Sequence, residues 1–129
     1  FVAANRSDGA GIRLLLNEGF KAVIISTEVN PVVAARAKKI GLPYFQGIGD
    51  KRRTLLSYLE TEGCLAEETV YVGNDLNDLP CFPIVAFTFA VADAHEEVLR
   101  QADHVLMRKG GYGAVREVCD MILRKYEKS

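Results

Sequence analysis

The sequence predicts an α/β fold in which a parallel β-sheet is covered by helices on both faces. Short apolar runs alternate with helical patterns, the connections between them are short, and the apolar runs are typical of strands buried on both faces. Helices are expected at residues 8–18, 30–40, 51–62, 79–85, 94–101 and 113–128. Strands are expected at residues 22–26, 42–46, 69–73, 86–91 and 104–107.

The first two elements follow from apolar patterning. In the first helix Ile12, Leu15 and Leu16 share one face, and Gly19 ends the helix because glycine favours the conformation that terminates helices. The strand at 22–26 is a continuous apolar run rich in β-branched residues, which indicates burial on both faces.

The next two helices have clear start and stop signals. Asn30 is a suitable N-cap, and Pro31 fits the first helical position, where no backbone donor is needed. Gly41 ends this helix. Asp50 is the expected cap of the following helix, and Gly63 its end.

The second half continues the alternation. The helix at 79–85 is expected to be short, because Pro80 and Pro83 interrupt it. The closing helix carries a buried apolar face, formed by Val115, Val118, Cys119, Ile122 and Leu123.

Size and composition indicate one globular domain, residues 1–129, that binds neither nucleic acid nor membrane. The net charge is −1, and no apolar run approaches the length of a membrane span. The three cysteines have no metal-ligand or paired spacing, which favours buried thiols in a reducing cytoplasm. No signal-peptide pattern is found in the sequence. No glycine-rich phosphate loop of a nucleotide-binding type is found either, which argues against a nucleotide-binding or response-regulator-like domain.

The alternation also asks for a strand before the first helix. Crossovers in a parallel sheet link two strands, and residues 1–4 are too short to supply the first of them. Because the chain opens at Phe1 within an apolar stretch, we expect the domain to be incomplete at its N-terminus and to lack its first, central strand.

Polar residues follow three of the expected strands, where α/β sheets bind ligands. Ser26 is at the end of the first strand, Lys51 lies after the second, and Asn74, Asp75 and Asp78 follow the third. Lysine suits a phosphoryl group, and oxygen ligands next to phosphate favour Mg²⁺. Positive charge is unfavourable at a helix start, so Lys51 itself indicates a nearby anion.

These residues lie in segments that resemble the haloacid dehalogenase superfamily. The matching runs are residues 23–26 (VIIS), 49–51 (GDK) and 71–78 (YVGNDLND), in the order of motifs two, three and four. Residues 90–95 and 109–117 (KGGYGAVRE) narrow the match to the 3-deoxy-D-manno-octulosonate 8-phosphate phosphatase group. That group includes sialic-type 9-phosphate phosphatases and the phosphatase-like domain of acylneuraminate cytidylyltransferases.

The resemblance implies a capless three-layer Rossmann-like fold and a Mg²⁺-dependent phosphatase of keto-sugar acids, acting through an aspartyl-phosphate. It implies catalytic roles for Ser26, Lys51 and Asp78 and a metal site at Asn74 and Asp75. Thr27, Glu28 and Arg116 would join Ser26 and Lys51 in binding the substrate. Glu28 could equally be a solvated loop acid, and Arg116 a surface ion pair.

The family's Asp-x-Asp nucleophile motif is not found in this sequence, so the chain is expected to be inactive by itself. The resemblance also implies a homotetramer and, for the octulosonate enzymes, a place in lipopolysaccharide biosynthesis. The alternative is a non-catalytic oligomerisation domain of an acylneuraminate cytidylyltransferase, which Asn74 favours because it stands where an aspartate is usual.

Overall fold

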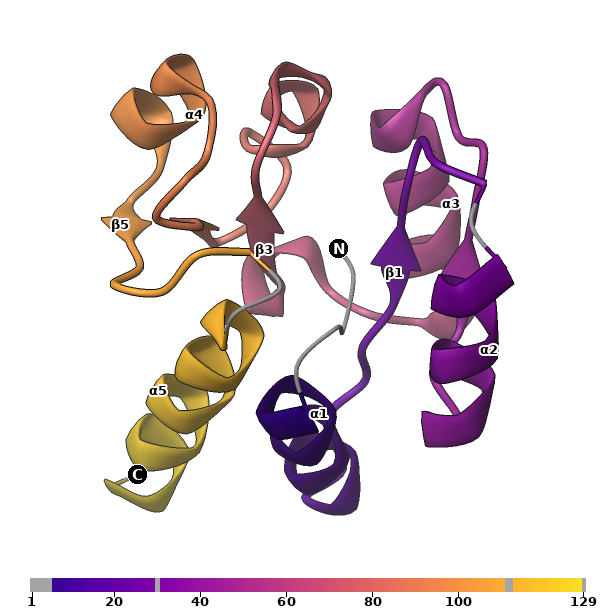
Figure 1. Ribbon diagram of the computed structural model, residues 1–129, viewed down its shortest axis with the longest axis vertical. Helices are drawn as coiled ribbons and strands as arrows, with labels where there is room; N and C mark the ends of the chain where they lie inside the picture. The colour runs from indigo at the N-terminus through magenta and orange to yellow at the C-terminus, as the bar shows by residue number, and fades with distance from the viewer. Residues whose placement is uncertain (1–5, 30, 111–112, 129) are drawn as a thin grey trace.

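The computed structural model describes residues 6–29, 31–110 and 113–128 (Figure 1). Its α-helices are α1 (Arg6–Asn17), α2 (Pro31–Ile40), α3 (Lys51–Glu62), α4 (Glu96–Gln101) and α5 (Ala114–Lys128), and its 3₁₀-helices are η1 (Ala66–Glu68) and η2 (Leu76–Cys81). The strands are β1 (Ile24–Ile25), β2 (Tyr44–Phe45), β3 (Val70–Gly73), β4 (Phe87–Ala90) and β5 (His104–Val105). The expectations for residues 1–4, Asn30, Gly111 and Tyr112 lie outside the described residues.

The strands form two parallel sheets, as the α/β prediction requires. β1 pairs with β2, and β4 lies between β3 and β5. β1 and β3 point the same way in Figure 1, and within the described part of the chain no pairing joins them. One helix links each pair of consecutive strands, except that both α3 and η1 lie between β2 and β3.

Helices cover both faces of β1. Successive side chains of a strand point to opposite faces, so the two residues of β1 contact different helices. Ile24 packs in one apolar cluster with residues of α1, α2 and α5, whereas Ile25 packs with Leu55 and Leu59 of α3 on the other face. The predicted three-layer α/β architecture is confirmed. Across the described residues, no helix is long and apolar enough to cross a membrane.

The helix expected at 79–85 was placed wrongly. The segment is instead the 3₁₀-helix η2, which begins at Leu76 immediately beyond the third predicted strand. Asp75 and Asp78 form a reciprocal capping box at its start. Pro80 fits inside this short helix, and the chain leaves it at Phe82. The capping box therefore fixes the segment that carries the candidate acids.

Candidate active site

Lys51 and Asp78 meet in a buried ion pair at the carboxyl edge of the strands. Lys51 begins α3, and Asp78 lies in the first turn of η2, 27 positions later. The Lys51 Nζ to Asp78 Oδ1 distance is 2.8 Å, and the two side chains are 6% and 3% exposed. The sequence predicted an anion next to Lys51, and the Asp78 carboxylate is one such anion.

Asp78 uses both carboxylate oxygens. Oδ1 accepts from Lys51 and, at 2.6 Å, from the Tyr71 hydroxyl. Oδ2 accepts from the backbone amides of Asn74 at 2.9 Å and Asp75 at 3.1 Å. Burial by itself would raise the pKa of Asp78, but the Asn74 amide, Lys51 and Tyr71 outweigh it and hold this pKa below its ordinary value. The carboxylate is thus ionised and fixed.

Tyr71 was not identified as a site residue from the sequence. It lies on β3, and its hydroxyl donates to Asp78. Burial, followed by the charge of Asp78, strongly raises the pKa of Tyr71, so the hydroxyl stays protonated. A tyrosine within an apolar strand pattern is normally interpreted as a core residue. The sequence signal that could have identified Tyr71 is its position two residues before the Gly-Asn-Asp turn.

Gly73 allows this arrangement to close. A Cβ atom at Gly73 would lie 3.0 Å from the Phe82 ring and 3.2 Å from the Asp78 Cβ. These distances are shorter than ordinary van der Waals contacts, so a side chain here would push Asp78 or Phe82 outward. Glycine at the end of β3 is therefore a packing requirement of the site.

Ser26 is buried directly beyond β1. Its Oγ accepts from the Glu28 amide at 3.0 Å, and its carbonyl accepts from the Ile48 amide at 3.0 Å. The second bond ties the segment after β1 to the loop that leads into α3 and Lys51. Thr27 and Glu28 are exposed on this segment, at the same edge of the molecule.

Asn74 and Asp75 are exposed beside the ion pair. Asp75 Oδ1 accepts from the Leu76 amide at 2.7 Å, and the Asp75 side chain also accepts from the Asp78 amide in the capping box. Asn77 adds a buried Oδ1 for which the structure gives no hydrogen-bond partner. Amide and carboxylate oxygens are donors that suit Mg²⁺, so the residues present fit part of a magnesium site. Across the described residues, however, no group of three or more acidic, histidine or cysteine side chains gathers to hold a metal.

Arg116 lies away from this cluster in its described contacts. It is in α5, where its Nε donates to Asp120 Oδ1 at 2.9 Å, and its Cδ would lie 2.9 Å from a Cβ at Gly11 of α1. The neighbouring Glu117 has a different task, because its carboxylate accepts from the amides of Met107 and Arg108. Glu117 therefore anchors the start of the loop that follows β5.

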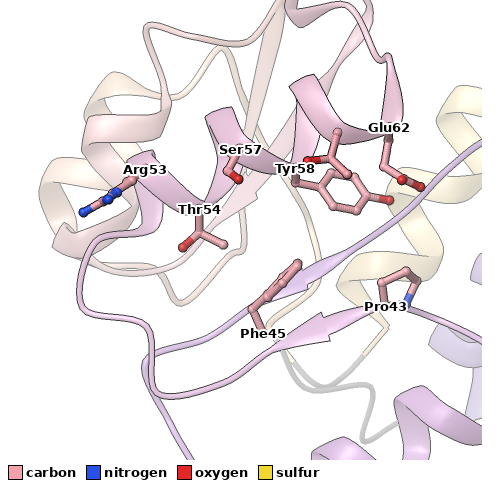
Figure 2. A pocket seen from close by; sticks show the side chains of 8 residues that line it. Pro43, Phe45, Arg53, Thr54, Ser57, Tyr58 and Glu62 are labelled. Atoms are coloured by element: carbon pink, nitrogen blue, oxygen red, sulfur yellow. The ribbon is translucent and has the colours of Figure 1, made fainter.

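A separate groove of about 570 Å³ lies between α3 and β2 (Figure 2). Phe45 and Tyr58 meet edge to face on its wall, with ring centroids 6.3 Å apart. The lining residues are Pro43, Phe45, Arg53, Thr54, Ser57, Tyr58, Thr61 and Glu62. None of the predicted site residues is among them, so this groove is distinct from the Lys51–Asp78 cluster.

Comparison with known proteins places the chain in a family. The family of haloacid dehalogenase-like hydrolases matches residues 44–117. The chain is 37% identical over 123 residues to the 3-deoxy-D-manno-octulosonate 8-phosphate phosphatase of Haemophilus influenzae, with 95% of this chain and 68% of that protein covered.

Solved structures agree with the sequence comparison. The crystal structure of the Yersinia pestis 3-deoxy-D-manno-octulosonate 8-phosphate phosphatase is similar with a TM-score of 0.92 and 40% identity, covering 96% of this chain and 68% of that one. The Moraxella catarrhalis enzyme, crystallised with magnesium, phosphate and the sugar acid, gives a TM-score of 0.87 and 33% identity, covering 92% and 68%. The chain belongs to the haloacid dehalogenase-like hydrolases, in their 3-deoxy-D-manno-octulosonate 8-phosphate phosphatase-like group, and the predicted enzyme class, phosphoric monoester hydrolase, is confirmed.

Proposed function

We propose that the protein is a Mg²⁺-dependent phosphatase of a phosphorylated keto-sugar acid, either 3-deoxy-D-manno-octulosonate 8-phosphate or a nonulosonate 9-phosphate. The observation that carries the proposal is the buried pair of Lys51 and Asp78 next to the buried Ser26 segment. The names of the similar enzymes support the sugar-acid class, and the magnesium and phosphate in the Moraxella catarrhalis structure support the metal.

The residues of this chain have distinct tasks in that reaction. Lys51 neutralises charge on the phosphoryl group, and the Ser26 hydroxyl donates a hydrogen bond to one of its oxygens. Asp78 fixes the Lys51 ammonium, because both of its oxygens are already engaged. Asn74 and Asp75 would hold Mg²⁺, which supplies further charge neutralisation when it is bound.

The nucleophile would be an aspartate on a further strand between β1 and β3, and a second aspartate two residues later would act as general acid and base. In the described residues β1 and β3 each pair with a neighbour on one edge only, an arrangement that such a strand would complete. The reaction would pass through an aspartyl-phosphate on that strand. The chain without it would be inactive.

The sugar end of the substrate would lie over Thr27 and Glu28, which are exposed beyond β1. Arg116 remains a proposed partner for the substrate carboxylate. Its bond to Asp120 is half exposed and would have to open or be shared when the carboxylate binds. We further propose a cytoplasmic homotetramer, in which a neighbouring subunit helps to close the site.

The decisive experiment is phosphate release from a panel of sugar-acid phosphates by the full-length protein. Lys51→Ala should lower kcat at least about 100-fold, because it removes a charge that stabilises the transition state. Lys21→Ala is the matched control, since Lys21 is an exposed lysine paired with Glu62. Unchanged turnover in Lys51→Ala would show that the site is assigned to the wrong residues.

Asn74 favours the second candidate, a phosphatase-like oligomerisation domain of an acylneuraminate cytidylyltransferase. An asparagine oxygen carries less charge than a carboxylate and holds Mg²⁺ more weakly. Absence of phosphate release by the full-length protein, together with retained oligomerisation, would favour this candidate over the enzyme.

A further inference from the structure

Tyr71 is the one neutral side chain bonded to the buried Lys51–Asp78 pair in the described residues. Its hydroxyl is 2.6 Å from Asp78 Oδ1, the same oxygen that lies 2.8 Å from Lys51 Nζ. The other oxygen, Oδ2, is held by two backbone amides. Each carboxylate oxygen therefore has a donor other than the lysine. These bonds fix the rotation of the carboxylate independently of Lys51.

The Tyr71 hydroxyl is itself fixed by the apolar core. The Tyr71 ring meets the Phe82 ring edge to face, with centroids 6.0 Å apart. Phe82 is in turn seated over Gly73, where no Cβ would fit without a shift. The position of the hydroxyl is thus set by β3 and the end of η2 rather than by the ion pair.

A lysine needs such support more than an arginine would. Its ammonium is a point charge on a flexible four-carbon stem, and it has no planar geometry of its own to define its direction. Catalytic groups must be held within about 0.5 Å of their working position. A carboxylate that is free to rotate would let the ammonium follow it away from the phosphoryl group.

We propose that Tyr71 is a positioning residue, which fixes Asp78 Oδ1 and thereby the Lys51 ammonium at the phosphoryl site. This inference rests on the proposed phosphatase function for its catalytic consequence. It assigns Tyr71 no contact with the substrate, so substitution should affect turnover rather than substrate affinity.

The test is Tyr71→Phe in the full-length protein, which removes one oxygen and keeps the ring. A hydrogen bond to a charged group is lost, so kcat should fall about tenfold. KM should stay within about threefold of the wild-type value. Tyr58→Phe is the matched control, because Tyr58 is also half-buried but lies in the groove between α3 and β2. It should leave both constants unchanged.

The environment of the Lys51 ammonium group is followed through its ¹H–¹⁵N resonance. The resonance is assigned as the signal that disappears in Lys51→Met. A buried, hydrogen-bonded ammonium exchanges its protons slowly, so the wild type and Tyr58→Phe should give the same resolved signal. Tyr71→Phe should broaden or shift it. 3-Fluorotyrosine at position 71, which retains the donor, should restore both the signal and turnover.

An unchanged Lys51 resonance in Tyr71→Phe would overturn the inference, whether or not kcat falls. Equal loss of turnover with 3-fluorotyrosine and with phenylalanine would also overturn it, because the hydroxyl would then not be the active feature. If the wild type releases no phosphate, the proposed function fails, and the Lys51 resonance by itself decides whether Tyr71 positions the lysine.

Discussion

Asp78 stabilises the fold mainly because both of its carboxylate oxygens accept hydrogen bonds. A buried ion pair adds little net stability, because the desolvation of both charges offsets their attraction. Here the carboxylate also receives Tyr71 and two backbone amides, so none of its acceptor positions is left exposed to an apolar core. What the pair supplies is a defined position for Lys51, which is the property that the proposed catalytic role of Lys51 requires.

Asp78→Asn should destabilise the protein by about 3–5 kcal/mol, because it leaves Lys51 as an uncompensated buried charge. Urea unfolding at pH 7 measures the change. Asp120→Asn is the control, since Asp120 pairs with Arg116 near the surface and should cost at most about 1 kcal/mol. Equal effects of the two substitutions would contradict the buried-pair interpretation.

The same substitution has an expected pH dependence. The folded-state pKa of Asp78 lies below its ordinary value of 3.8, so its ionised form stabilises the fold above that pH. This contribution is lost as the pH falls through the folded-state pKa. The difference in unfolding free energy between wild type and Asp78→Asn should therefore be constant near neutral pH and shrink below pH 3.8. A difference that grew in acid would have the wrong sign.

At the scale of elements, α1 and α5 pack closely because of one glycine. A Cβ at Gly11 would lie 2.9 Å from Arg116 Cδ and 3.1 Å from the buried Cys119 Cβ. Gly11→Ala should gain about 1 kcal/mol of helix propensity and lose more to overpacking, for a net destabilisation of about 1–2 kcal/mol. Gly49→Ala, with open space around its Cβ, should have a smaller effect in the same thermal unfolding measurement.

The loop after β5 is held by two acids, one in α5 and one in the turn between β4 and α4. Glu117 of α5 accepts from the amides of Met107 and Arg108, whereas Asp93 accepts from the Gly110 amide at 2.9 Å. Glu117→Ala should speed hydrogen exchange at Met107 and Arg108 more than at Gly110, and Asp93→Ala should do the reverse. Each variant serves as the control for the other, and identical exchange patterns would show that the loop opens as one unit.

At the scale of the whole molecule, two parallel sheets end in strands β1 and β3, which point the same way and are not paired with each other in the described residues (Figure 1). A strand placed there would join the sheets and bring its carboxyl end between Ser26 and Asp78. Exposed apolar side chains also follow the strands, with Val29 79% and Met107 88% exposed. The first observation supports the proposed additional strand, and the second supports the proposed neighbouring subunit.

Light scattering on the full-length protein should give the mass of a tetramer. The 129-residue chain by itself should release no phosphate, because the proposed nucleophile lies on the additional strand. A monomeric full-length protein with full activity would contradict the proposed role of neighbouring subunits. Phosphate release by the 129-residue chain would show that the nucleophile lies within it.

The sequence predicted the structure best where the structure depends on residues that are adjacent in the chain. α3 has the predicted bounds, because Asp50 Oδ1 accepts from the Arg53 amide and Gly63 adopts the left-handed conformation with φ +65°. η2 was misplaced because Pro80 and Pro83 dominate the local pattern, while the capping box of Asp75 and Asp78 requires the turn to be folded.

Local signals in the chain were sufficient for the α/β class and the family resemblance, and they named Lys51 and Asp78 as candidates. Periodicity, caps and short motifs are properties of adjacent residues, so they can be read without coordinates. Tertiary structure alone revealed that Lys51 and Asp78 bond each other, that Tyr71 joins them and that Arg116 turns to Asp120. The Lys51–Asp78 and Tyr71–Asp78 bonds join separate elements, so their geometry depends on how α3, β3 and η2 pack, whereas the Arg116–Asp120 pair lies within α5.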